Sequence, residues 1–90
     1  MNEERIAQID ARLRSAFEPS SLEIEDQSHM HAGHAGAKAG KGHFRVAIVS
    51  NRFTGKSPLQ RHRLIYEALG GLMESDIHAL TIEASSEESA

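Results

Sequence analysis

The stretch FRVAIV at residues 44–49 is the strongest strand signal in this 90-residue sequence, and it decides the fold. Its apolar and β-branched residues are typical of a strand in the middle of a sheet. Upstream, Leu22 and Ile24 alternate with glutamates, which predicts a shorter strand with one wet face. We expect the two strands to pair with each other.

A helix is predicted before this strand pair, and a long loop is predicted within it. Apolar residues recur every three or four positions from Ile6 to Phe17, which indicates an amphipathic helix that Pro19 ends. Residues 26–42 are rich in histidine, glycine and alanine and contain no branched aliphatic residue. Because such a segment cannot hold a packed face, we predict a long, mobile loop of the kind that is often functional or disordered.

A second helix is predicted after a turn at residues 53–56. The sequence SPLQ at residues 57–60 combines an N-cap serine, a proline at the first helical position and a glutamine at the third. This capping-box signature places the start of the helix at Pro58. The pair Gly70 and Gly71 weakens the helix, so it can break into two pieces there.

The third predicted strand covers residues 77–84, with His78 on the same face as Leu80. The element order is therefore helix, strand, strand, helix, which can divide into two at the glycine pair, and strand. A three-stranded sheet with helices on one face is the natural arrangement, which is an α+β two-layer fold. A chain this short has room for one domain, which we assign to residues 1–84, with residues 85–90 as a flexible tail.

Charge is segregated along the chain, although the formal net charge is only −3. Residues 1–26 carry three basic and seven acidic side chains, residues 27–66 carry seven basic and no acidic ones, and residues 67–90 carry six acidic and no basic ones. The basic middle segment suggests a surface for nucleic acid, for a phosphorylated or carboxylated ligand, or for an acidic protein. A solvated face is the alternative interpretation.

Several classes of function are excluded by what the sequence lacks. It contains no cysteine, so it has no disulfide, no thiolate nucleophile and no all-cysteine metal or iron–sulfur site of its own. It also has no Gly-x-Ser-x-Gly motif and no Walker phosphate loop, so we do not expect an enzyme. The acidic N-terminus resembles neither a secretory signal nor a transit peptide, and no apolar stretch approaches the ~20 residues of a membrane span. We expect a soluble, cytoplasmic protein.

Histidines are the candidate metal ligands. His31 and His34 lie in the predicted loop, and His43 closes it. Imidazole is a common metal ligand, but this spacing matches no zinc motif, and a solvated loop without specific binding is the alternative. His78, taken alone, is more typical of a half-buried histidine than of a ligand.

Arginines of the predicted second helix are candidates for anion binding. Arg61 and Arg63 project from its first turns. Guanidinium groups bind phosphate or carboxylate through paired hydrogen bonds, but a solvated helix face has the same composition. The residues alone leave both interpretations open.

Three separate stretches together resemble the BolA family. They are HFRVAIVS at residues 43–50, FTGKSPLQRHRLIY at residues 53–66 and IHAL at residues 77–80. The resemblance covers roughly residues 4–84 and joins three elements in the same order and at the same distances. It implies an α+β fold like that of a class II KH domain, in agreement with the predicted element order.

The resemblance implies a non-enzymatic partner of a monothiol glutaredoxin, with which it shares a [2Fe–2S] cluster for iron–sulfur maturation, trafficking or iron regulation. Histidine can replace cysteine on one iron of such a cluster. On this interpretation the glutaredoxin and glutathione supply sulfur, and this chain supplies imidazole. The strand histidine of the family matches His78. The loop ligand is matched best by His34, with His43 and then His31 as fallbacks.

The resemblance also implies an alternative function, because some BolA proteins are DNA-binding transcriptional regulators. Phosphate contacts would then come from the basic middle segment, with Lys56, Arg61 and Arg63 as the candidates. A positive segment suits an acidic glutaredoxin surface or the carboxylates of glutathione equally well. Charge alone therefore does not decide between the two functions.

Overall fold

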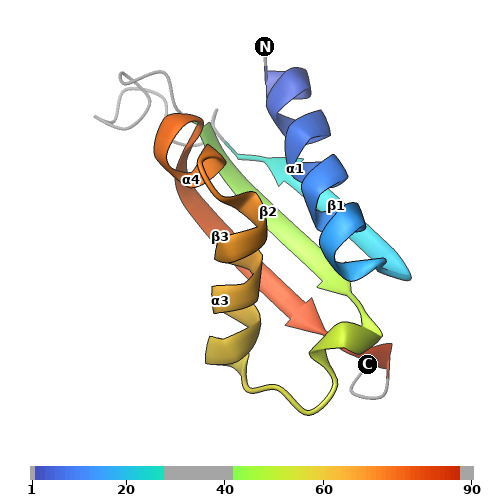
Figure 1. Ribbon diagram of the computed structural model, residues 1–90. Helices are drawn as coiled ribbons and strands as arrows, with labels where there is room; N and C mark the ends of the chain where they lie inside the picture. The colour runs from blue at the N-terminus through green and yellow to red at the C-terminus, as the bar shows by residue number, and fades with distance from the viewer. Residues whose placement is uncertain (1, 28–41, 88–90) are drawn as a thin grey trace.

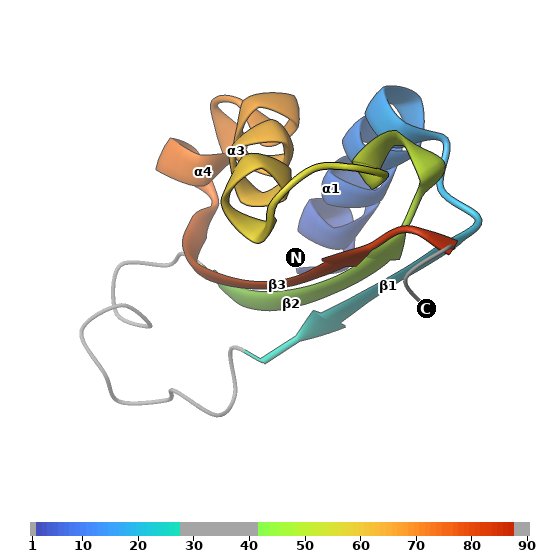
Figure 2. The same ribbon diagram turned by 90° about the horizontal axis from the view of Figure 1, so that it is seen from below.

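The computed structural model describes residues 2–27 and 42–87 (Figure 1). The elements follow in the order α1 (Asn2–Phe17), β1 (Ser21–Asp26), β2 (Gly42–Val49), the short 3₁₀ helix η2 (Asn51–Phe53), α3 (Pro58–Leu69), α4 (Leu72–Ser75) and β3 (Ile77–Ser85). Figure 2 shows α1, α3 and α4 on one face of the sheet. The predicted α+β two-layer fold is therefore confirmed. We call the opposite face of the sheet, which none of these described helices covers, the open face.

The sheet has the strand order β1-β2-β3, so β2 is its central strand. β1 runs antiparallel to β2, and β3 runs parallel to it after the crossover through α3 and α4 (Figure 1). Phe44, Val46 and Ile48 are at most 1% exposed, because alternate residues of β2 point toward the helices. The predicted central position of this strand and its pairing with β1 are confirmed.

Helix α1 packs its apolar side into the core. Ile9, Leu13 and Phe17 are buried, at the spacing of three or four residues that the sequence predicts. The helix ends at Phe17, where Glu18 takes a positive φ of 44°. Pro19 follows, and the residue before a proline is disfavoured in the helical conformation. The predicted end of the helix is confirmed.

The start of α3 has the predicted capping box. Ser57 Oγ accepts a hydrogen bond from the backbone N–H of Gln60 at 3.2 Å, and Gln60 Oε1 accepts one from the N–H of Ser57 at 2.8 Å. The helix begins at Pro58, as predicted. It ends before Gly70, whose φ of 52° lies in the region that favours glycine. Because α4 begins as a separate helix at Leu72, the predicted split is confirmed.

The first residues of β3 depart from the predicted alternation. The strand register shifts between Gly42 and His43, and His78 is the additional residue of the resulting β-bulge. His78 is exposed, whereas Leu80 packs against the core. The prediction that His78 shares a face with Leu80 is therefore wrong, because the bulge interrupts the period of two.

Parts of two predicted segments lie outside the described residues. These parts are residues 28–41, which make up most of the predicted loop, and residues 88–90 at the end of the predicted tail. β3 ends at Ser85, one residue beyond the predicted strand, and Ser86 is 2% exposed. The candidate ligands His31 and His34 belong to residues 28–41 and therefore lie outside the described residues.

Candidate functional site

Two histidines meet where β2 and β3 begin. His43 alternates with the buried Phe44 and therefore projects toward the open face of the sheet. His78 is the bulged residue of β3, and its ring centroid lies 4.9 Å from that of His43, with the ring planes inclined at 46°. The bulge therefore brings together two of the predicted metal-binding candidates, which are 35 positions apart in the sequence.

The two histidines differ in exposure. The side chain of His78 is exposed, whereas His43 is half-buried and its Nε2 atom is inaccessible to solvent. The backbone carbonyl of His43 accepts a hydrogen bond of 2.8 Å from the N–H of Gln27, just beyond the end of β1. This hydrogen bond holds the main chain of His43 in place beside the ring of His78. His78 is the solvent-exposed imidazole of the pair.

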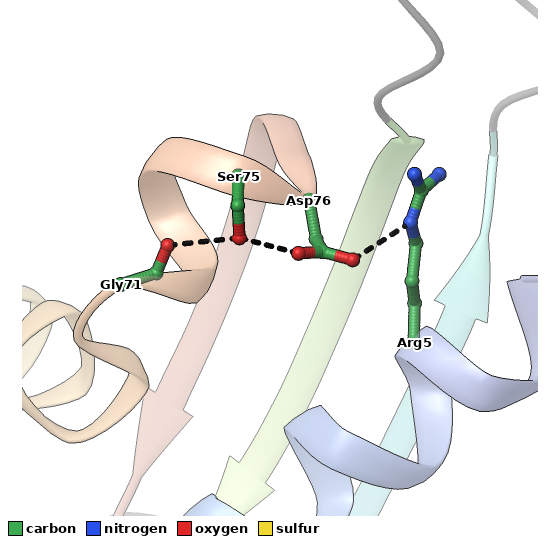
Figure 3. A network of polar contacts seen from close by, with 4 residues as sticks. All are labelled: Arg5, Gly71, Ser75 and Asp76. Atoms are coloured by element: carbon green, nitrogen blue, oxygen red, sulfur yellow. Dashed lines mark hydrogen bonds and ion pairs between the residues drawn. The ribbon is translucent and has the colours of Figure 1, made fainter.

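A network of polar contacts surrounds Asp76, two residues before His78 in the sequence (Figure 3). Asp76 Oδ2 accepts a hydrogen bond from Arg5 Nε at 3.1 Å, and its Oδ1 accepts one from the hydroxyl of Ser75. Ser75 Oγ also lies 3.1 Å from the carbonyl oxygen of Gly71. The hydrogen bond from Ser75 and, to a lesser extent, that from Arg5 lower the pKa of Asp76, because both stabilise its carboxylate form. Asp76 is therefore ionised at neutral pH.

The described residues do not form a complete metal site of their own. Across residues 2–27 and 42–87, no group of three or more histidine, cysteine, aspartate or glutamate side chains is arranged to hold a metal ion. Two adjacent imidazoles are a partial ligand set, since tetrahedral iron or zinc needs four donors. A metal ion bound at this pair would therefore need further ligands from outside the described residues.

Two arginines of the basic middle segment are paired with glutamates. Arg45 forms an ion pair with Glu83 across the open face, with an Nη2–Oε2 distance of 2.7 Å. The hydrogen bond and the negative charge of the Glu83 carboxylate raise the pKa of Arg45 above its ordinary value. Arg52 forms an ion pair with Glu18. The positive charge of the segment is thus partly neutralised by acidic residues from either end of the sequence.

The three predicted anion-binding residues separate into two groups. Arg61 is half-buried, and its Nη1 donates a hydrogen bond of 3.0 Å to the carbonyl of Ala84, which ties α3 to β3. Lys56 and Arg63 are exposed and line the same shallow hollow, together with Glu67. The structure therefore leaves Lys56 and Arg63 as an accessible basic pair and engages Arg61 within the fold.

Sequence reasoning missed Arg5 and Asp76 as parts of this region. They lie 71 residues apart, and no local pattern links them. The available signal was that Asp76 directly precedes the strand histidine motif at residues 77–80. Only the packing of the fold brings Arg5 of α1 within hydrogen-bond distance of Asp76 at the junction of α4 and β3.

Comparison with known proteins identifies the family. The family model described as "BolA-like protein" matches residues 13–89. BolA-like protein 1 of Mus musculus is 50% identical over 78 residues, which cover 87% of this chain and 55% of that protein. The DNA-binding transcriptional regulator BolA of Escherichia coli (strain K12) is 43% identical over 74 residues, which cover 82% of this chain and 68% of the regulator. The chain belongs to the BolA-like family.

A solved structure supports the same assignment. The BolA domain of SufE1 from Arabidopsis thaliana superposes with a TM-score of 0.85 at 42% sequence identity, over 96% of this chain and 95% of that one. The chain spans only about half the length of the mouse relative. None of the helices in the two described ranges has the length and apolar character of a membrane span.

Proposed function

We propose that this chain is a non-enzymatic, cytoplasmic partner of a monothiol glutaredoxin, and that the two proteins share a glutathione-dependent [2Fe–2S] cluster. The role would be iron–sulfur maturation, trafficking or iron regulation. The observation that carries the proposal is the exposed imidazole of His78 beside His43, at the end of the sheet where residues 28–41 join β2. Membership of the BolA-like family supports it.

The donor chemistry of this region fits such a cluster. Histidine nitrogen can replace thiolate on one iron, which raises the reduction potential of the cluster. Because the chain has no cysteine, the thiolate ligands of the cluster would come from the glutaredoxin and from glutathione. The cluster, when bound, would supply electron storage and transferable iron and sulfide.

His78 and His34 are the proposed ligands from this chain. His78 is the exposed imidazole of the pair, whereas the buried Nε2 of His43 makes His43 less suitable as a ligand. His34 lies nine residues before His43, outside the described residues. The resemblance to the family favours His34 as the second ligand, with His43 and then His31 as the alternatives.

The experiment is anaerobic titration of cluster-loaded monothiol glutaredoxin with this chain, followed by visible circular dichroism. We expect wild type to produce a new spectrum, and His78→Ala and His34→Ala to lose it. His62→Ala is the matched control and should behave as wild type, because His62 belongs to α3 on the helical face of the sheet, whereas His43 projects toward the open face. If His78→Ala and His34→Ala give the wild-type spectrum and complex stability, the ligand assignment is wrong.

We propose DNA binding as the second candidate function. The exposed pair Lys56 and Arg63 favours it, and the Escherichia coli relative is named as a DNA-binding regulator. Binding should weaken steeply as salt rises, and Lys56→Ala or Arg63→Ala should each reduce the salt slope by about 1. Arg52→Ala is the control, because Arg52 is paired with Glu18. Undetectable or salt-insensitive binding at moderate ionic strength would remove this candidate.

A further inference from the structure

Asp76 occupies the junction between α4 and β3 and is held on three sides. Its backbone N–H donates to the carbonyl of Leu72 in α4 at 3.0 Å, and its own carbonyl accepts from the N–H of Gly42 in β2 at 3.0 Å. Its carboxylate accepts from Arg5 of α1 at 3.1 Å and from the neighbouring Ser75 (Figure 3). One residue therefore connects two helices to the first residue of the central strand.

This junction lies next to the register shift that displaces His78. The N–H of Gly42 donates to the carbonyl of Asp76, and the register shift falls between Gly42 and His43, the first two residues of β2. On the other strand, the buried Ile77 separates Asp76 from His78. A displacement of Asp76 would consequently move the start of both strands and change how the two imidazole rings meet.

The contact with Arg5 ties Asp76 to α1, which the backbone hydrogen bonds of Asp76 do not reach. The bonds of Asp76 to Leu72 and Gly42 fix its main chain, but α4 is a single turn of four residues and has little stability of its own. Arg5 comes from the 16-residue α1, which is anchored in the core. The side chains of Arg5 and Asp76 are 25% and 28% exposed, so their ion pair is only partly screened by water.

We propose that Asp76 is a positioning residue, which through Arg5 holds the β-bulge so that the ring of His78 lies against His43 in the orientation needed for cluster binding. This inference rests on the proposed function. It assigns to Asp76 and Arg5 no contact with the cluster. Groups that orient a metal ligand in this way typically change affinity 10–100-fold when they are removed.

The test compares Asp76→Asn with Asp10→Asn in the full chain. Asparagine keeps the size and backbone bonds of Asp76 but lacks the charge that pairs with Arg5. Asp10→Asn is the matched control, because it removes an ion pair with Arg14 on the exposed side of α1, the helix that carries Arg5. The first readout is the nuclear Overhauser effect between the rings of His43 and His78 in the cluster-free protein. The second is the visible circular dichroism titration described above.

We expect Asp76→Asn to weaken the ring-to-ring effect and to lower the apparent affinity in the titration about tenfold, the low end of the range for groups that orient a ligand. Asp10→Asn should match wild type in both. Arg5→Ala should reproduce Asp76→Asn, and Arg5→Lys should restore part of the affinity. The two Arg5 variants also carry the test if Asp76→Asn does not fold.

Two outcomes overturn the inference. One is an unchanged ring-to-ring effect in Asp76→Asn and Arg5→Ala, and the other is a lost ring-to-ring effect with an unchanged titration. Failure of the proposed function looks different, since His78→Ala would then titrate as wild type does. In that case the ring-to-ring effect alone still decides whether Asp76 positions His78.

Discussion

The two ends of β2 are built differently. At the C-terminal end, the buried hydroxyl of Ser50 donates to the carbonyl of Phe17 at 2.7 Å, and its N–H donates to the carbonyl of Ser85 at 2.9 Å. Phe53 is fully buried there, with its ring 4.8 Å from that of Phe17. At the N-terminal end, the exposed His78 and the partly exposed pair of Arg5 and Asp76 take the corresponding positions.

We expect this difference to separate stability from the proposed cluster binding. Buried rings and satisfied buried hydrogen bonds stabilise the fold, and their removal leaves cavities or unpaired polar groups. Exposed imidazoles contribute little to stability and remain available to a partner. Substitutions at the Ser50 end should therefore lower the free energy of unfolding, and substitutions at the His78 end should change cluster binding.

Phe53→Ala should have the largest effect on stability. The ring is 0% exposed, so its removal leaves a cavity, and we expect the free energy of unfolding to fall by about 3–5 kcal/mol. Chemical denaturation measures this change. Leu59→Ala is the control, because Leu59 is 59% exposed, and it should remain within about 0.5 kcal/mol of wild type. Equal losses in the two variants would contradict the assignment of Phe53 to the core.

Ser50→Ala should have the next largest effect. It deprives the carbonyl of Phe17 of a buried donor, which should lower the free energy of unfolding by about 1–3 kcal/mol. Ser20→Ala is the matched control, since its hydroxyl makes a longer bond of 3.3 Å on the exposed surface, and it should change stability by less than about 0.5 kcal/mol. A Ser50→Ala protein as stable as Ser20→Ala would show that the buried bond does not stabilise this end.

Asp76→Asn should produce a smaller change that depends on pH. The folded pKa of Asp76 is lowered from its ordinary value of 3.8, so its carboxylate stabilises the fold above that pH. This contribution, less than about 1 kcal/mol, is lost as the pH falls through the folded pKa. Denaturation curves at about pH 6 and about pH 2.5 should therefore differ less for Asp76→Asn than for wild type. Parallel pH dependence in the two proteins would contradict this expectation.

His78→Ala should have the smallest effect on stability. The side chain is exposed and lies in a bulge, so the free energy of unfolding should stay within about 0.5 kcal/mol of wild type. The same variant should lose the glutaredoxin-dependent spectrum. A loss of stability as large as that of Ser50→Ala would erase the distinction between the two ends of β2.

Signals that depend on a few neighbouring residues were predicted well. The capping box of Ser57 and Gln60, the split at Gly70 and the central strand at residues 44–49 are all confirmed. Each is encoded by local backbone preferences or by a short periodic pattern. The role of Arg61 was not predictable in this way, because its acceptor, the carbonyl of Ala84, lies 23 residues away.

The sequence by itself determined the element order, the one-sided packing of the helices and the resemblance to the BolA family, since periodicity, capping and motif spacing are written in consecutive residues. Only the tertiary structure decided that a bulge removes His78 from the face of Leu80 and sets its ring beside His43. It also decided that Arg5 reaches Asp76. These contacts depend on strand register and helix packing, which join residues distant in the chain and follow from the fold as a whole.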